Sequence, residues 1–176
     1  MQKIFERILQ SGLASWIIIF EAVCGISRFL GKLSSSCIED FATLELEKIG
    51  IENPLLNIVS DLATDSNLPA SDLCSLLHKL CKTESADIQQ AQRIWRAFAL
   101  EDTLCHLDQE PVYGLIKLSK FWMNWGWPTD APACMVNPSQ TKISQDYHSV
   151  SNYEHIIREH KTWLDDELKT LKSYGK

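Results

Sequence analysis

Apolar residues recur three and four positions apart through most of this 176-residue chain, which is the spacing of one face of an α-helix. Two clear stripes are Leu73, Leu76, Leu77 and Leu80, and then Ile88, Ala91, Trp95 and Phe98. Seven glycines and six prolines are too few for the many tight turns of an all-β chain. The sequence therefore predicts an all-α fold: a single-domain bundle, or a short solenoid-like stack, of about seven helices.

The chain length predicts one helical domain over residues 1–176. A domain of this size buries roughly 70% of the surface that its unfolded chain exposes, so its core needs no disulfide and no metal. The six cysteines are scattered and follow no metal-binding spacing. We therefore expect free thiols, as in a reducing cytosol, at Cys24, Cys37, Cys74, Cys81, Cys105 and Cys134.

Start and stop signals give approximate helix boundaries. We expect helices over residues 2–9, 13–30 and 36–49, and further helices that begin near Asn53, Asn67, Ser85, Pro111 and Ser151. Ser36-x-x-Glu39 and Ser151-x-x-Glu154 each match a capping box, in which the serine and the glutamate both satisfy free backbone N–H groups. A further turn, with a weaker helical pattern than these helices, is expected over residues 101–107. Residues 128–150 show no periodicity and predict a long loop, in which residues 133–143 could hold a short strand.

The apolar run Leu13–Phe20 follows Lys3 and Arg7 and superficially resembles a signal peptide. Glu6 interrupts the basic region, and Glu21 ends the apolar run. Eight apolar residues are too few to span a bilayer. We therefore expect this run to form a buried helix of a cytoplasmic protein that has no membrane partner.

The sequence contains no recognisable catalytic or metal-binding motif. His155 and His160 lie five positions apart and so point to different faces of a helix, whereas a helical zinc pair is four apart. There is no Cys-x-x-Cys, no Gly-x-Ser-x-Gly turn and no glycine-rich phosphate loop. Adjacent acids such as Asp165-Asp166-Glu167 are typical of a solvated face. We therefore expect no catalytic residue, no metal and no cofactor.

Negative charge is concentrated in the centre of the sequence. Fourteen of the 23 acidic residues fall between Cys37 and Glu110, where only five basic residues accompany them. Such a stretch repels a phosphate backbone, which disfavours direct nucleic-acid binding, and it attracts a cationic protein. A solvated surface that serves only solubility is the alternative. The candidate partner-binding residues are Glu39, Asp40, Glu45, Glu47, Asp61 and Asp65, with a second group formed by Glu101, Asp102 and Trp127.

The segment Phe121–Pro128 is the most aromatic part of the chain. Trp122 and Trp125 lie at helical spacing, which favours a place in the core. Trp127 follows the expected end of the helix and precedes the long loop. We therefore expect Trp127 to be partly exposed, where it could anchor an interface.

Two strings and the closing helix carry a family resemblance. The strings are Ile94-Trp95-Arg96-Ala97-Phe98-Ala99-Leu100-Glu101-Asp102 and Trp125-Gly126-Trp127-Pro128-Thr129-Asp130, and the helix holds Tyr153 to Trp163. Together they resemble a bacterial family of small all-helical proteins known as a domain of unknown function. That family is similar to the immunity proteins that accompany polymorphic toxins, including contact-dependent growth inhibition systems. Ala99-Leu100 departs from the family pattern, which has an aromatic residue and a proline there.

This resemblance implies a cytoplasmic protein that binds and neutralises one cognate toxin domain, without implying any residue-level mechanism. Because the centre of the chain is acidic, we expect the toxin domain to be basic, and a nuclease with a basic cleft is one such toxin. Two alternatives are a non-catalytic helical adaptor, whose acidic surface serves only solubility, and an enzyme with an unrecognised site.

Overall fold

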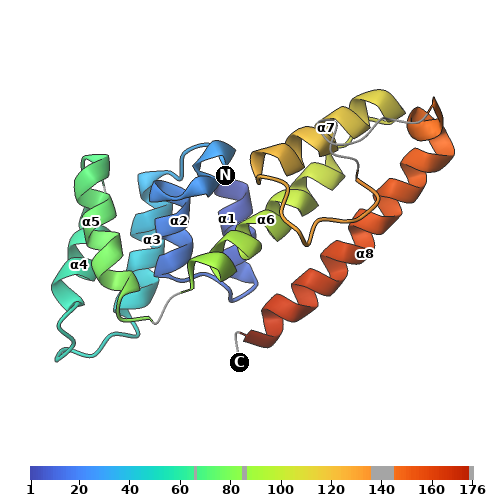
Figure 1. Cartoon of the computed structure of the whole chain (residues 1–176). Coiled ribbons are helices and arrows are strands. Elements are labelled where there is room, and N and C mark those ends of the chain that lie inside the picture. The colour runs from blue at the N-terminus through green and yellow to red at the C-terminus, as the bar shows by residue number, and fades with distance from the viewer. Residues whose placement is uncertain (66, 85–86, 136–144, 175–176) are drawn as a thin grey trace. The chain divides into compact units, whose positions relative to one another are not determined.

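The computed structural model describes residues 1–65, 67–84, 87–135 and 145–174. This part of the chain contains α-helices, two short 3-10 helices and no strand, so the predicted all-α fold is confirmed (Figure 1). The described elements are α1 (Gln2–Gln10), α2 (Trp16–Cys24), η1 (Ile26–Leu30), α3 (Ser35–Leu46), α4 (Leu56–Thr64), α5 (Ala70–Cys81), α6 (Ile88–Cys105), α7 (Pro111–Asn124), η2 (Gln145–His148) and α8 (Val150–Tyr174).

The chain forms two compact units, Met1–Trp95 and Arg96–Lys176. We call them unit 1 and unit 2 and describe each by itself. The prediction of one domain over residues 1–176 stays a prediction.

The core of unit 1 is built around α2. Its sequence is apolar on nearly every side, and Ile18 and Ile19 are completely buried. Such a helix is stable in water only when other helices surround it. Within unit 1, α2 packs against α5, and α3 packs against α4. The indole Nε1–H of Trp95 donates to the Ile18 carbonyl at 2.8 Å, and the Trp95 ring stacks on Phe5.

The helix expected over residues 13–30 is shorter than predicted, because α2 ends at Cys24 and η1 follows. The side chain of Glu21 is buried, and one of its carboxylate oxygens accepts hydrogen bonds from the Ser27 backbone N–H at 3.1 Å and from the Ser27 hydroxyl at 3.3 Å. A Cβ atom on Gly25 would lie 2.1 Å from the Glu21 carboxylate. The turn after α2 therefore depends on a residue without a side chain at position 25.

The prediction that all six cysteines are free is wrong for two of them. Cys24 at the end of α2 and Cys74 on α5 form a disulfide, with their Cα atoms 6.1 Å apart. The pair was missed because 50 residues separate the two cysteines in sequence, and only the packing of α2 against α5 brings them together. Four cysteines are free, namely Cys37, Cys81, Cys105 and Cys134.

Both predicted capping boxes are displaced by two residues. The N-cap of α3 is Ser34 rather than Ser36, and its hydroxyl oxygen accepts from the Cys37 N–H at 3.4 Å. At the start of α8, the hydroxyl of Ser149 rather than that of Ser151 accepts from the Asn152 N–H, at 3.2 Å. In each case the serine that caps is the one whose hydroxyl reaches the N–H three residues on. Helix α3 ends at Leu46, three residues earlier than expected.

Unit 2 contains the end of α6 together with α7, η2 and α8. One face of α7 is buried and includes Trp122, and Trp125 is the residue that ends this helix. Their exposures of 0% and 7% confirm the predicted core position of both. Helix α6 is continuous through Ala99-Leu100 to Cys105, so the separate turn expected over residues 101–107 is wrong. Most of the strand that residues 133–143 could hold falls outside the described residues.

A buried histidine pairs with Trp122 inside unit 2. His160 on α8 has no exposed surface, and its Nε2 accepts the indole N–H of Trp122 at 2.9 Å. The proton of the neutral ring therefore sits on Nδ1, which donates to the Ile156 carbonyl at 2.7 Å. Burial lowers the pKa of His160.

One residue of the acidic run Asp165-Asp166-Glu167 on α8 is buried. Glu167 is 8% exposed, so the expectation that these acids form a solvated face is wrong for Glu167.

Candidate functional site

Six of the predicted partner-binding residues lie on two helices of unit 1. Glu39, Asp40 and Glu45 are on α3, and Glu47 is the residue that ends it. Asp61 is on α4, and Asp65 is the residue that ends that helix. Because α3 and α4 pack against each other, the structure brings these six residues onto one pair of helices. We call Glu39, Asp40, Glu45, Glu47, Asp61 and Asp65 the acidic helix pair.

The six carboxylates differ in exposure. Glu39 and Glu45 are half-buried, whereas Asp40, Glu47, Asp61 and Asp65 are exposed. Asp40 and Glu47 are two helical turns apart and point away from the buried face of α3 that holds Phe41 and Ala42. This arrangement leaves four carboxylates of the pair in contact with solvent.

Some of these charges are already compensated. The carboxylate of Glu45 forms an ion pair with Lys48 at 2.6 Å. Asp65 uses its carboxylate to accept the Asn67 N–H at 2.9 Å, which caps the turn after α4. Asp40, Glu47 and Asp61 form no ion pair with any residue that the structure describes. A cationic group that approached any one of these three carboxylates would therefore displace no described internal cation.

The remaining three predicted residues lie in unit 2. Glu101 and Asp102 are half-buried on α6, and the Asp102 carboxylate lies 3.7 Å from the His106 ring. Trp127 is half-buried, as expected, and its backbone has a positive φ of 51°. The predicted contact set is thus divided, with six residues in unit 1 and three in unit 2.

The segments that carry the family resemblance meet in unit 2. The buried guanidinium of Arg96, from the first string, pairs with the carboxylate of Asp130, from the second string. On the closing helix, Trp163 donates its indole N–H to the Asp130 carbonyl at 2.6 Å, and its ring lies 5.6 Å from the Arg96 guanidinium carbon. A cation over an indole face is an attractive contact. These residues hold the segment after α7 against α6 and α8, which is a structural role for the two strings.

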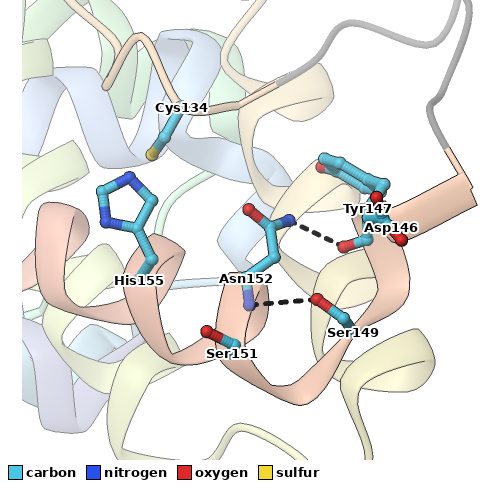
Figure 2. Close-up of a pocket in the computed structure, with 7 residues that line it drawn as sticks. All are labelled: Cys134, Asp146, Tyr147, Ser149, Ser151, Asn152 and His155. Carbon is cyan, nitrogen blue, oxygen red and sulfur yellow. Dashed lines mark hydrogen bonds between the residues drawn. The ribbon is translucent and has the colours of Figure 1, made fainter.

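Unit 2 also contains a polar pocket that the sequence analysis missed. Its volume is about 500 Å³, and its lining comes from the segment before residue 136, from η2 and from the first turns of α8 (Figure 2). The lining residues are Cys134, Asp146, Tyr147, Ser149, Ser151, Asn152 and His155. The polar residues Ser149, Ser151 and Asn152 lie close together in the sequence, but their spacing gives no reason to place Cys134 beside them.

The pocket is better suited to hydrogen bonding than to nucleophilic catalysis. In Figure 2 the Cys134 sulfur points toward the His155 ring. Burial, and then the nearby Glu159 carboxylate, raises the pKa of the Cys134 thiol to about 11. Because the thiolate is the reactive form, this thiol is not activated at neutral pH. The side-chain amide of Asn152 donates to the Tyr147 carbonyl at 2.7 Å, which fixes one wall.

Within residues 1–65, 67–84, 87–135 and 145–174, no three His, Cys, Asp or Glu side chains are placed to hold one metal ion. None of the described helices is both long enough and apolar enough to cross a bilayer.

Comparison with known proteins gives one match. No curated protein and no solved structure matches the chain. The model of a family described as "Uncharacterized protein conserved in bacteria (DUF2247)" matches residues 14–168. This match covers most of the chain and includes both strings and the closing helix that suggested a bacterial domain of unknown function. The chain therefore belongs to the DUF2247 family.

Proposed function

We propose that this protein is an immunity protein that binds one cognate toxin domain stoichiometrically and neutralises it in the cytoplasm. The supporting observation is the set of four exposed carboxylates on the acidic helix pair, Asp40, Glu47, Asp61 and Asp65. The corresponding surface of the toxin would be basic, as in the substrate cleft of a nuclease. The proposal includes no catalytic activity, no cofactor and no direct contact with nucleic acid.

The carboxylates would act mainly on the rate of association. A concentrated negative charge steers a basic protein during diffusional encounter and raises the on-rate by roughly 10- to 1,000-fold at low salt. Steering acts before the surfaces meet, so it does not require the complex to bury each charge in a low-dielectric interior, which would cost free energy. The lifetime of the complex would depend on apolar anchors, for which Trp127 is the predicted candidate.

The proposal expects an adjacent reading frame that encodes a large secreted protein with a variable C-terminal domain, and the direct test is co-expression with that domain. Survival of the cells supports the proposal. Continued toxicity, with this protein folded and abundant, rejects it.

Charge reversal tests the steering step. The variant D40K/E47K should slow association with the toxin domain about tenfold or more at low salt, and the difference from the wild type should shrink as salt screens the charges. The matched control is E154K/D165K, which reverses two exposed acids on α8 of unit 2. Equal rates for both variants would mean that total charge, and not the acidic helix pair, governs the encounter.

The cytoplasmic location has its own test. Disulfides are rare in the reducing cytosol, so the Cys24–Cys74 bridge argues against this part of the proposal. Thiol titration of protein unfolded directly from its native cells would count six thiols if the protein resides in the cytosol, since the chain has six cysteines. A count of four, matching the four free cysteines, would place it in an oxidising compartment.

A helical adaptor is the second candidate, because α7 exposes apolar side chains on one face. Tyr113, Ile116 and Met123 are 64%, 56% and 59% exposed. An adaptor that uses this face would lose its partner in the I116D variant and keep it in D40K/E47K. The opposite pattern would favour the acidic helix pair.

A further inference from the structure

Unit 1 contains an apolar cavity that the proposed function does not use. Its volume is about 530 Å³, and it lies among α2, α3, α5 and the two loops that precede α3 and α5. A volume of this size is within the range of small-molecule sites, roughly 300–1,000 Å³. The apolar part of its wall includes Val23, Leu33, Ile38, Leu68 and Leu73.

The cavity wall has few polar side chains, and the only charged one among its lining residues is a lysine. Lys32 lines the cavity, is exposed and forms no ion pair with any described residue. Ser35, the first residue of α3, and Asn67 complete the polar part of the wall. No acidic side chain lines the cavity, although unit 1 as a whole has more acidic than basic residues. The wall is therefore mostly apolar, with one cationic group, two neutral polar side chains and no anionic group.

Part of the cavity wall is held by core packing and, where the Cys24–Cys74 disulfide is formed, by a covalent bond. Val23 and Leu73 are the immediate neighbours of Cys24 and Cys74, so the disulfide joins α2 to α5 directly beside the cavity. On the α3 side, Ile38 is 2% exposed and belongs to the core. The part of the wall that Ile38 and Leu73 form is core packing and is present before a ligand arrives, with or without the disulfide, which reduces the entropic cost of binding.

We propose that this cavity binds a single-chain amphiphile that ends in a carboxylate, with the alkyl chain against the apolar wall and the carboxylate at Lys32. An alkyl chain gains free energy by leaving water for this wall. The carboxylate matches the charge of Lys32, whereas a cationic head group would face an uncompensated like charge. A strongly polar ligand would lose its hydration to a wall that offers few hydrogen-bonding groups. The proposal does not depend on the toxin.

A chain-length series tests the proposal without any variant. Calorimetric titration with octanoate, decanoate and dodecanoate, each below its micelle concentration, should give one site per chain. Each added methylene that enters the cavity should tighten Kd by about fourfold. The absence of saturable binding by dodecanoate, or a Kd independent of chain length, would overturn the proposal.

Two pairs of variants locate the site. K32Q should weaken decanoate binding about twofold to fivefold, as expected for an exposed charge pair. The control K79Q removes a lysine of α5 that does not line the cavity, and it should leave decanoate binding unchanged. A70F places a large ring at a cavity-lining but exposed position, and should weaken binding at least tenfold, whereas S71F on the next residue should not.

Circular dichroism shows that each variant is folded before it is titrated. Unchanged binding in both K32Q and A70F would place the ligand elsewhere and overturn the assignment. Decanol that binds as tightly as decanoate, with no effect of K32Q, would refute the role of the carboxylate. Binding to vesicles of anionic phospholipid, but not to monomeric decanoate, would also overturn it.

Discussion

The hydrogen bond between Trp122 and His160 predicts how stability depends on pH. In the folded protein, His160 Nε2 accepts the Trp122 N–H and Nδ1 donates to Ile156, so both ring nitrogens are used by the neutral ring. Protonation would place a second N–H against the indole N–H in a site with no solvent exposure. Both the burial and this geometry disfavour the charged form, and the pKa of His160 is lowered from its ordinary value of 6.5.

The sign of the effect follows from this shift. The unfolded chain takes up a proton at His160 below pH 6.5, whereas the folded protein does so only at lower pH. The stability that the neutral ring provides is therefore complete above the unfolded pKa and is lost as pH falls below it. The loss has a limiting slope of about 1.4 kcal/mol per pH unit for one proton.

The perturbation that isolates this residue is H160L. At about pH 7.5, the variant leaves the buried Trp122 N–H without an acceptor, which should cost roughly 1–3 kcal/mol of unfolding free energy. Between about pH 7.5 and about pH 5.5, the wild type should lose about 1 kcal/mol more than H160L, because the variant lacks the titrating ring.

Urea unfolding at several pH values measures both quantities. H155L is the matched control, since His155 lies on the same helix and is exposed. This control should keep the pH dependence of the wild type. A stability difference between wild type and H160L that stays constant between pH values would refute the reasoning about His160.

Two further predictions concern unit 1. G25A should destabilise the protein by about 2 kcal/mol or more, because the new Cβ would lie 2.1 Å from the buried Glu21 carboxylate. The control G50A has nothing within 4 Å of its new Cβ and should stay within about 0.5 kcal/mol of the wild type in the same unfolding assay. Replacing Cys24 and Cys74 together by alanine should lower the unfolding free energy by roughly 2–4 kcal/mol. Adding a thiol reductant to the wild type should remove most of the difference between the wild type and this variant. Equal stability with and without the bridge would contradict a stabilising role of the disulfide.

The helices were largely predictable, because the information that specifies them is local. The stripe Leu73–Leu80 lies on α5, and the stripe that begins at Ile88 lies on α6. The errors came at boundaries, where one hydroxyl or one carboxylate decides the outcome. Ser34 caps α3 because its hydroxyl reaches the Cys37 N–H, and a neighbouring serine with the same propensity does not.

The candidate sites were less predictable, because they combine residues from distant parts of the chain. The six residues of the acidic helix pair were named from charge alone, and their shared location follows from the packing of α3 on α4. The polar pocket joins Cys134 to the first turns of α8, and the apolar cavity joins residues from α2, α3 and α5. No spacing in the sequence indicates either set.

The sequence by itself determined the all-α fold, the apolar character of α2 and the core positions of Trp122 and Trp125, since each depends on residue type and helical spacing. Only the tertiary structure decided which distant side chains meet: Cys24 with Cys74, Arg96 with Asp130 and Trp122 with His160, which are 50, 34 and 38 residues apart. The physical reason is that helix periodicity specifies which face of a helix is apolar, while the partner of that face and its register are set by how all side chains of a unit pack together.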